Sequence, residues 1–500
     1  MEIELKLALQ PRHAARIRRH PLLSNSKPQQ HALLSIYFDT PKFDLMQRGV
    51  ALRLRRMGKQ WIQTLKAETQ SIGALTSRPE WEAVAAHGDR PDFSVLPQAA
   101  LNLLAGIKHK RIAPVFTTEF RRTAWQIGNS KAQAELALDR GKITAAGQHR
   151  EICEVEIELK SGKPEFLFDI AEQLLHAAPL HIEPRSKAER GYILSGAITP
   201  GPVQSIRPAI AQDQPAGEAW NAIVQAALVQ LTANVPGFLE NACDIEYLHQ
   251  LRVALRRLRT AAQLAKSLGQ QIPAWEHPLR ELMHALNPAR DWDLFQYEIM
   301  PGILPVLAVA PENAARDDET LALLQNTAAK VRRHAQALLL QAQFTQLMLN
   351  IGRSLLMTPA DSHRRDAGTW AATILEQRWQ KLRKCRHGFA ALNSAERHLA
   401  RIAAKKMRYS AEAFATLHGK PAMPFITALG ALQDELGAEN DRYAAMQLLN
   451  ELAQKSAAAA FQLGQISGAL AYAAAQHVQL PPASWKKLAR SALFWRSESS

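Results

Sequence analysis

The chain has 500 residues, with 61 Lys and Arg against 46 Asp and Glu, and a formal net charge of +15. This length excludes a single compact core, and 47% hydrophobic and 21% charged residues are ordinary for a folded soluble protein. Cys153, Cys243 and Cys385 lie too far apart to indicate a zinc site or a disulfide framework.

Lys and Arg outnumber Asp and Glu in both parts of the chain, by 29 to 21 in residues 1–200 and by 32 to 25 in residues 201–500. A polyanion is therefore a plausible partner, and nucleic acid, anionic lipid and polyphosphate all agree with this charge. The first ten residues alternate instead of forming a signal-peptide run, and no stretch approaches the ~20 apolar residues of a membrane span. We expect a cytoplasmic protein with no membrane partner.

The chain opens with MEIELKLAL, in which Glu2, Glu4 and Lys6 alternate with apolar residues. This period of two predicts a β-strand with one apolar and one charged face. Alternating stretches follow at 50–57, 61–66, 120–127, 134–139 and 151–160, and helical patterns occur at 11–20, 94–105 and 164–177. We therefore predict a strand-rich domain over residues 1–197.

Acidic residues recur on one face of the last of these strands. Glu154, Glu156 and Glu158 alternate along EICEVEIELK, about 150 residues after the acids of the opening strand. A row of like charges is costly unless cations lie against it, although a solvated outer face is the simpler alternative. Arg53 and Arg55, which share a strand face, are candidate partners of the acids.

A barrel whose interior holds acids and bases together would account for both rows. Carboxylates suit hard Mg²⁺ or Mn²⁺, and Arg and Lys suit phosphate oxygens. Such a barrel would hold a hydrated metal–phosphate.

The Glu-x-Glu-x-Lys start resembles the signature of the CYTH, or triphosphate tunnel metalloenzyme, family. The resemblance extends through IYFDT (36–40), LRLR (52–55), TLK (64–66), RPEWE (78–82), RTAW (122–125), LALDRG (136–141), ICEVEIEL (152–159) and SKAERGY (186–192). It implies an eight-stranded antiparallel tunnel that binds triphosphate with a divalent metal.

The resemblance also implies roles for single residues. Metal would be held by Glu2, Glu4, Asp139, Glu154, Glu156 and Glu158. Phosphates would be held by Lys6, Arg53, Arg55, Lys66, Arg122 and Lys187, the last of which is expected in a loop or short helix. Glu4, Lys6 and Glu156 are the candidate catalytic residues, and Glu80 is an acidic position whose role the resemblance leaves open.

Residues 198–217 form a predicted linker, and from 218 to 493 the spacing of apolar residues predicts helices. HQLRVALRRLR (249–259) and HLARIAAKKMR (398–408) share one pattern at an offset of 149, and Asp291 and Asp441 correspond at an offset of 150. We infer an internal duplication. A basic helix face is usually solvated, but a duplicated one without acids favours an anion site.

This part resembles a CHAD domain through the two basic motifs, RDWD (290–293), KKMRY (405–409) and LQDELG (432–437). The resemblance implies two four-helix bundles around a surface that binds inorganic polyphosphate. The candidate polyphosphate-binding residues are His249, Arg252, Arg256, Arg259, His398, Arg401, Lys405 and Arg408. Arg332, Arg333, Arg378, Lys381, Arg383, Lys384 and Arg386 could widen this surface. A metal-ligand role for the two histidines is disfavoured because their neighbours are cationic.

The sequence thus predicts an α+β protein with a β tunnel followed by a duplicated helical domain. The predicted activity is hydrolysis of inorganic triphosphate to diphosphate and phosphate with Mg²⁺ or Mn²⁺. Adenylate cyclase or thiamine triphosphatase activity, or polyphosphate binding without catalysis, are the alternatives. Nucleic acid is disfavoured because few aromatic residues lie among the basic runs. The physiological substrate, the acid that activates water, the oligomeric state and any communication between the domains stay open.

Overall fold

The structure is a computed structural model that describes residues 2–67, 71–72, 75–241, 244–307, 318–356, 365–385, 394–476 and 484–496. The chain forms two compact units. The first, here called the tunnel unit, spans residues 1–203, 232–240 and 339–357. The second, the helical unit, spans residues 204–231, 241–338 and 358–500. Two segments within the predicted helical domain therefore belong to the tunnel unit, and the predicted domain boundaries stay a prediction.

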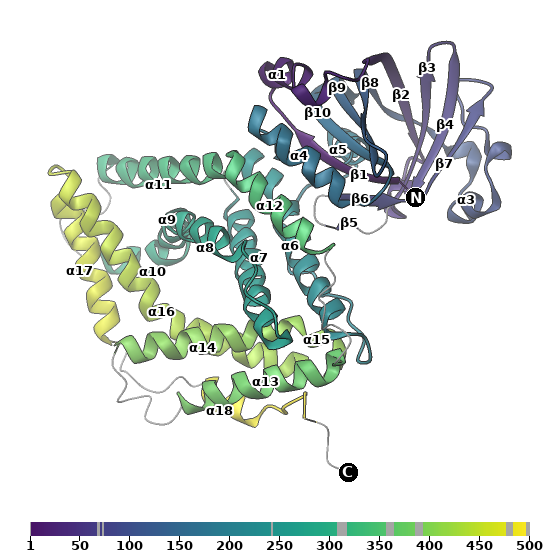
Figure 1. Cartoon of the computed structure of the whole chain (residues 1–500). Coiled ribbons are helices and arrows are strands. Elements are labelled where there is room, and N and C mark those ends of the chain that lie inside the picture. The colour runs from purple at the N-terminus through teal and green to yellow at the C-terminus, as the bar shows by residue number, and fades with distance from the viewer. Residues whose placement is uncertain are drawn as a thin grey trace. The chain divides into compact units, whose positions relative to one another are not determined.

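The tunnel unit is built on one antiparallel sheet (Figure 1). Its strands are β1 (Glu2–Ala8), β2 (Gln29–Asp39), β3 (Val50–Met57), β4 (Gln60–Ala67), β5 (Ser71–Ile72), β6 (Leu75–Arg78), β7 (Glu80–Ala85), β8 (Ala113–Gly128), β9 (Gln133–Ala145), β10 (Gln148–Ser161) and β11 (His181–Ile182). They are ordered β5-β6-β1-β10-β9-β8-β2-β3-β4-β7, and β11 pairs with β1.

The sheet closes on itself through the run of chain at residues 75–85. β6 pairs with β1, where Leu75 lies opposite Leu5, and β7 pairs with β4, where Glu80 lies opposite Lys66. Only Pro79 separates β6 from β7, and a proline interrupts a strand because it has no N–H to donate. If β6 and β7 count as one strand and the two-residue β5 and β11 are set aside, eight strands surround the tunnel. The predicted fold class is confirmed.

The apolar faces of the strands point outward and are covered by helices. Leu5, Val155 and Leu138 belong to a buried cluster together with residues of α1 (Ala14–Arg18) and α4 (Glu165–Ala177). On the opposite side, Leu52 and Leu65 pack with residues of α2 (Asp44–Gln47) and α3 (Gln98–Leu103). Small barrels usually fill their interior with apolar side chains. Here the apolar cores lie outside, so the charged faces are turned inward.

A helix from late in the chain completes one of these outer cores. α12 (Ala342–Ser354) packs against α4, and its Leu349 is fully buried in the same cluster. The hydroxyl of Thr345 donates to the carbonyl of Leu180 at 2.6 Å, and Arg353 forms a 2.7 Å ion pair with Asp169. α12 is therefore a structural part of the tunnel unit.

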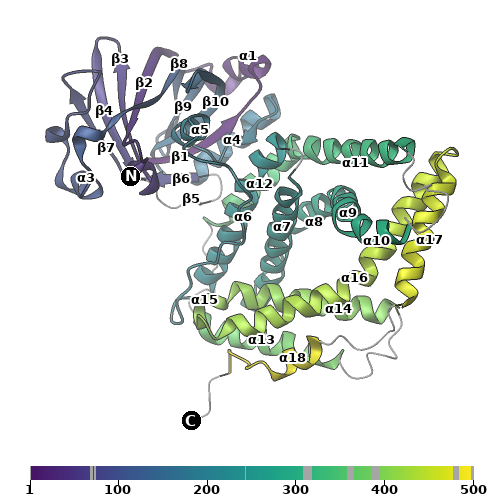
Figure 2. The same cartoon turned by 180° about the vertical axis from the view of Figure 1, so that it is seen from behind.

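The helical unit contains most of the remaining helices (Figure 2). Their bounds are α6 (Ala216–Glu240), α7 (Ile245–Leu264), α8 (Glu276–Ala285), α9 (Asn287–Leu294), α10 (Met300–Leu307), α11 (Asp318–Leu339), α13 (Ala367–Lys384), α14 (Ser394–Ala413), α15 (Ala415–His418), α16 (Ala422–Lys455), α17 (Ala460–Gln476) and α18 (Ser484–Arg490); α6 contributes its last nine residues to the tunnel unit. One hydrophobic cluster contains Trp292 and Phe295 together with Leu449 and Leu463. The two predicted repeats therefore share a core.

α6 is long and apolar enough to cross a membrane by length and composition alone. Its most apolar 18-residue window has a mean hydropathy of 1.4, and 72% of that window is buried. No stretch of this kind was expected from the sequence. A core helix of a folded domain has the same length and composition, and the burial of α6 agrees with that role.

We predict that Leu349→Ala destabilises the tunnel unit by about 2–5 kcal/mol, because it leaves a cavity between α12 and α4. Amide hydrogen exchange of the full-length protein should then be faster in β1, β10 and α4. The matched control is Leu340→Ala, since Leu340 is 38% exposed. Unchanged exchange in these strands would mean that α12 contributes nothing to the stability of the tunnel unit.

Candidate active site

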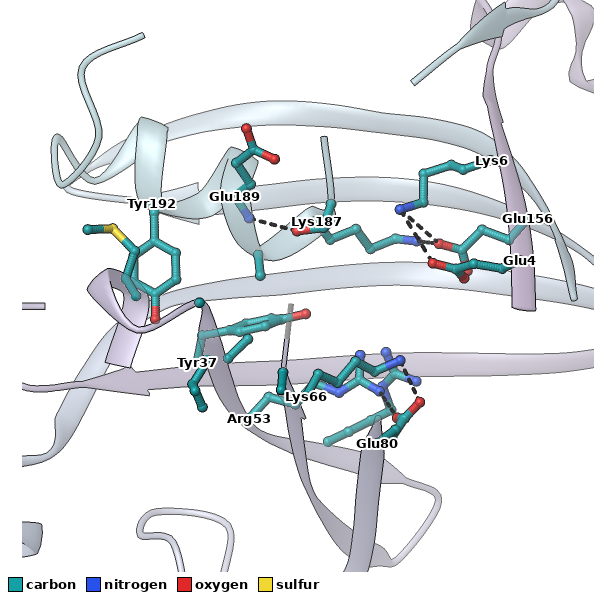
Figure 3. A pocket seen from close by; sticks show the side chains of 18 of the residues that line it. Glu4, Lys6, Tyr37, Arg53, Lys66, Glu80, Glu156, Lys187, Glu189 and Tyr192 are labelled. Atoms are coloured by element: carbon teal, nitrogen blue, oxygen red, sulfur yellow. Dashed lines mark hydrogen bonds and ion pairs between the residues drawn. The ribbon is translucent and has the colours of Figure 1, made fainter. Parts of the chain in front are cut away.

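The barrel encloses a cavity of about 670 Å³ with a strongly charged lining (Figure 3). This volume is in the range of small-molecule sites. Its charged lining residues are Glu4, Lys6, Arg53, Arg55, Lys66, Glu80, Glu82, Arg122, Glu156, Glu158, Lys160, Lys187 and Glu189. Most of the site residues predicted for the tunnel are thus brought together around one space.

One side of the cavity, here called the acidic wall, consists of Glu4, Glu156 and Glu158. The antiparallel register of β1 and β10 places Glu4 opposite Glu158 and Lys6 opposite Glu156, so that all four share a face. The Lys6 ammonium lies 3.9 Å from the carboxylates of both Glu4 and Glu156. The two acidic rows noted in the sequence are therefore neighbours.

The opposite side, here called the basic wall, consists of Arg53, Arg55 and Lys66 on β3 and β4. Glu80 lies between two of these cations, 2.7 Å from the Lys66 ammonium and 3.5 Å from the Arg53 guanidinium. Figure 3 shows this group across the cavity from Glu4 and Glu156. The two walls thus present opposite charges to the same space.

Arg55 differs from the other two cations of the basic wall. Its Nε donates to the Ser35 hydroxyl at 3.1 Å, and it forms no ion pair within the described part of the chain. Burial, reinforced by Arg53 and Arg122, lowers the pKa of Arg55 to about 10. A buried cation with cationic neighbours is stabilised by an incoming anion.

Tyr37 lies beside this wall and was not identified from the sequence. Its ring stacks on Phe116 at a centroid distance of 4.5 Å, and it lines the cavity. Burial acts to raise the pKa of the phenol, but Arg53 and Arg55 outweigh it and the pKa is lowered. The only sequence signal was its place in IYFDT, on the face of β2 opposite Arg53.

Asp139 and Glu154 lie behind the acidic wall and, together with Glu156 of that wall, form a cluster here called the buried triad. The Lys187 ammonium is 2.7 Å from Asp139 and 2.8 Å from Glu156, and it also forms an ion pair with Glu154. Arg122 binds Asp139 through two hydrogen bonds of 2.8 and 2.7 Å, and it also donates to Glu156. Asp139 and Glu154 are fully buried and do not line the cavity.

Ion pairs lower the pKa of two members of the buried triad, Glu154 and Glu156. Burial acts to raise the pKa of Glu156, but Lys187 and Arg122 hold that pKa well below its ordinary value. Burial acts to lower the pKa of Lys187, and the three carboxylates together raise it instead. Glu156 and Lys187 therefore stabilise each other's charged form.

Lys187 is placed by the start of α5 (Lys187–Leu194). The side chain of Ser186 accepts a hydrogen bond from the Glu189 N–H at 3.0 Å, a capping interaction that fixes the first turn. A cation at this position is disfavoured by the helix macrodipole, so the nearby carboxylates must supply the compensation. The sequence left the reach of Lys187 open, and the structure places it in the cavity lining.

Phe120 is a second residue that the sequence analysis missed. The Lys187 ammonium lies 4.9 Å from its ring centroid, and the guanidinium carbons of Arg122 and Arg55 lie at 5.8 and 5.9 Å. Cations are attracted to the face of an aromatic ring. The Phe120 ring therefore adds an attractive contact for three cations that lie near one another.

The donor atoms of the acidic wall fit a divalent cation. Mg²⁺ and Mn²⁺ prefer carboxylate oxygens, and Glu4, Glu156 and Glu158 present such oxygens to the cavity. The ligand atoms of the buried triad also lie within 4.8 Å of one another, but the Lys187 ammonium already occupies that position. We therefore expect metal at the acidic wall rather than at Asp139 and Glu154. The side chain of Glu2 lies outside the described part of the structure.

In the helical unit, the duplicated motifs lie on α7 and α14. Arg252, Arg256, Arg401 and Lys405 are half-buried, and burial together with Arg401 and Arg256 lowers the pKa of Lys405 to about 8. Arg401 pairs with Asp441 at 3.1 Å, and burial raises the pKa of Asp291, with Arg252 opposing it. These cations therefore share one electrostatic environment.

The other four predicted polyphosphate contacts differ from one another in their partners and in their burial. Arg259 and Arg408 have acidic partners, Glu276 at 3.3 Å and Glu412 at 2.8 Å. His249 is half-buried, with its pKa lowered by burial and by Arg290, whereas His398 is exposed.

The residues expected to widen this surface also differ from one another. Arg332 is 8% exposed and pairs with Asp293 at 2.9 Å, so the expectation that it widens the surface is wrong. Arg333, Lys381, Arg383 and Lys384 are exposed, and Arg378 is half-buried. Arg386 lies outside the described residues.

The ion pairs of the tunnel predict how its stability depends on pH. Glu154 and Glu156 have lowered pKa values, so their contribution is complete above the ordinary carboxyl pKa of about 4.3 and is lost as the pH falls through the folded values. Lys187 has a raised pKa, so its contribution is complete below about 10.4 and is lost at higher pH. The contribution of these three groups, measured as the difference in the free energy of unfolding between wild type and variants of the network, should therefore be flat between these limits.

Glu156→Gln should lower the stability of the tunnel unit by about 3 kcal/mol at neutral pH and reduce the slope of the acid side, because it removes one of the linked carboxylates. An acid slope as steep as that of the wild type would contradict the assignment of Glu156 to this network.

Comparison with known proteins agrees with this geometry. Residues 1–192 match the family model of the CYTH domain, and residues 222–450 match that of the CHAD domain. A curated relative from Haemophilus influenzae, named inorganic triphosphatase, is 32% identical over 194 residues, which are 39% of this chain and 54% of the relative. The match thus spans about half of that relative's length. The crystal structure of the CHAD domain from the plant Ricinus communis is 30% identical, with a TM-score of 0.51, and covers 58% of this chain and 97% of its own. The chain therefore consists of a CYTH domain followed by a CHAD domain.

Proposed function

We propose that this protein is a metal-dependent inorganic triphosphatase that converts triphosphate to diphosphate and phosphate in the CYTH tunnel. The observation that carries the proposal is that an acidic and a basic wall face one cavity of about 670 Å³. A metal–triphosphate complex presents a cation and a row of anionic oxygens, which are complementary to these two walls. The name of the Haemophilus influenzae relative supports the same reaction.

The composition of the lining favours inorganic triphosphate over a nucleotide or a thiamine ester. Of the 24 lining residues, 13 are charged, on both sides of the cavity. A substrate that is charged along its whole length uses all of these groups. A substrate with an apolar half would leave some buried charges without a partner, which is costly.

Substrate binding would exchange one set of ion pairs for another. The Lys6 ammonium lies 3.9 Å from its carboxylates, farther than in a hydrogen-bonded pair, so it can turn to a phosphate oxygen. Arg55 accepts the anion without losing a carboxylate partner. Glu80, left behind as Lys66 and Arg53 bind phosphate, remains between them and limits their repulsion.

The chemistry would follow from positioning and charge. A divalent metal at Glu4, Glu156 and Glu158 would supply charge neutralisation and polarise a water molecule. Arg53, Arg55, Lys66 and Arg122 hold the phosphates and stabilise the charge that develops on the leaving diphosphate. Because its ion pairs keep the pKa of Glu156 low, Glu156 is a weak base, and we assign it to cation binding rather than to proton removal.

We also propose that the CHAD domain binds inorganic polyphosphate on the face formed by Arg252, Arg256, Arg401 and Lys405, and so recruits it to the protein. What supports the proposal is that four half-buried cations lie near one another, so that burial first, and then Arg401 and Arg256, lower the pKa of Lys405 to about 8. The duplication places matching cations on α7 and α14. A linear polyanion suits such a face.

We predict that wild-type protein releases phosphate from triphosphate with Mg²⁺ or Mn²⁺, and that Glu4→Gln lowers the rate by roughly 10²-fold or more, since a buried charge that acts on the transition state is lost. Glu119→Gln is the matched control, because Glu119 is also a strand glutamate but is 68% exposed. Absence of release with either metal, or equal loss in both variants, would contradict the proposal.

Binding of long-chain polyphosphate by the full-length protein should weaken as the pH rises through about 8, where Lys405 loses its proton. The expected change between pH 7 and 9 is roughly three- to tenfold. Lys405→Arg keeps its charge and should bind with a flatter pH profile. Titration calorimetry at constant ionic strength makes the comparison, and identical profiles would argue against Lys405 as a contact.

A further inference from the structure

Arg190 is a buried cation next to the candidate site that neither the motif analysis nor the proposed mechanism uses. It follows Lys187 by three residues, so both project from the same side of α5. Arg190 is 4% exposed and does not line the cavity. Its guanidinium forms an ion pair with Glu154 and lies 4.0 Å from Glu183.

Arg190 is one of two cations that form an ion pair with Glu154, a member of the buried triad that does not line the cavity. Asp139, Glu154 and Glu156 face the three cations Arg122, Lys187 and Arg190. Lys187 contacts all three carboxylates, Arg122 contacts Asp139 and Glu156, and Arg190 contacts Glu154. Without Arg190, the fully buried Glu154 would depend on Lys187 alone. A buried carboxylate that loses one of two cations attracts the other more strongly.

We propose that Arg190 is a positioning residue of the tunnel: by sharing the charge of Glu154, it leaves Lys187, which pairs with all three carboxylates, able to turn to the phosphate oxygen that approaches from the cavity. The proposal rests on the proposed triphosphatase function. It also gives Glu154 a role different from the metal ligand that the sequence suggested. In this role Glu154 binds the Lys187 ammonium, and Lys187 binds a phosphate oxygen of the substrate.

The backbone of α5 is fixed by contacts other than those of Arg190. A Cβ at Gly191 would lie 2.1 Å from the Phe116 ring, so the glycine lets the helix lie directly on that ring. The Tyr192 hydroxyl donates to the Asp39 carboxylate at 2.9 Å. We therefore expect an Arg190 substitution to change the balance of charge rather than the position of the helix.

A charge-balance cycle tests the proposal. Arg190→Gln should raise the KM for triphosphate by roughly tenfold while kcat changes by less than about threefold, because Glu154 then has Lys187 as its one remaining ion-pair partner among the described residues and holds it more firmly against transfer to the substrate. Arg190→Gln combined with Glu154→Gln removes one charge of each sign and should restore KM to within about threefold of wild type. Arg150→Gln is the matched control, since Arg150 pairs with Glu240 in the same unit but is 35% exposed. A double variant as impaired as the single one would overturn the proposal.

A second measurement reports on the environment of the Lys187 ammonium and does not depend on catalysis. The ¹⁵Nζ resonance of Lys187 in labelled full-length protein, assigned by its loss in Lys187→Met, should move in Arg190→Gln and return in the double variant. This pattern in a protein without triphosphatase activity would reject the proposed function and retain the role of Arg190. An unmoved resonance in Arg190→Gln would reject that role whatever the activity. If Arg190→Gln does not fold, Arg190→Lys, which keeps the charge, should leave the resonance in place, and a shift there would overturn the proposal.

Discussion

The tunnel depends on electrical balance among charged side chains, many of which are buried. A carboxylate removed from water is tolerated only where a cation or hydrogen-bond donors compensate for it, and the same holds for a buried guanidinium. The structure meets this condition by placing acids and bases on facing strands, with Glu80 between Arg53 and Lys66 and the buried triad around Lys187. Because the charged faces point inward, the apolar faces must point outward. These apolar outer faces must be covered, and α1, α2, α3 and α4 cover them.

The same balance prepares the cavity for its proposed ligand. In the absence of ligand, every carboxylate of the acidic wall already lies near a cation, and Arg55 is already held in place by Ser35. Binding a metal and an anion together then exchanges partners and adds less net charge to the cavity than binding the anion alone. Little reorganisation is needed, which is the condition under which fixed charges stabilise a transition state most effectively.

The charged faces could be identified from the sequence because side chains two residues apart on a strand lie on the same face. Glu4, Glu156 and Arg53 could be found in this way. Period alone does not give depth in the barrel, so Glu154 was grouped with the metal ligands although α5 covers it. Arg190 was quoted within SKAERGY, and its helical spacing from Lys187 was the available signal. The burial of Arg332 on α11 against Asp293 was not foreseen, because it depends on tertiary packing. The closure of the barrel through residues 75–85 was not foreseen either, because it depends on pairing between strands that are far apart in the sequence.

The position of α12 has a consequence for synthesis of the protein. The apolar side of α4 is complete once residue 177 has been made, yet Leu349, which is buried against it, is encoded more than 170 residues later. At ordinary rates of translation this interval lasts roughly 10–30 seconds. During that time the nascent tunnel carries an uncovered apolar strip, which a chaperone would be expected to shield. The outer core of the tunnel unit is thus completed only after a helix that lies within the CHAD match of the sequence has been made.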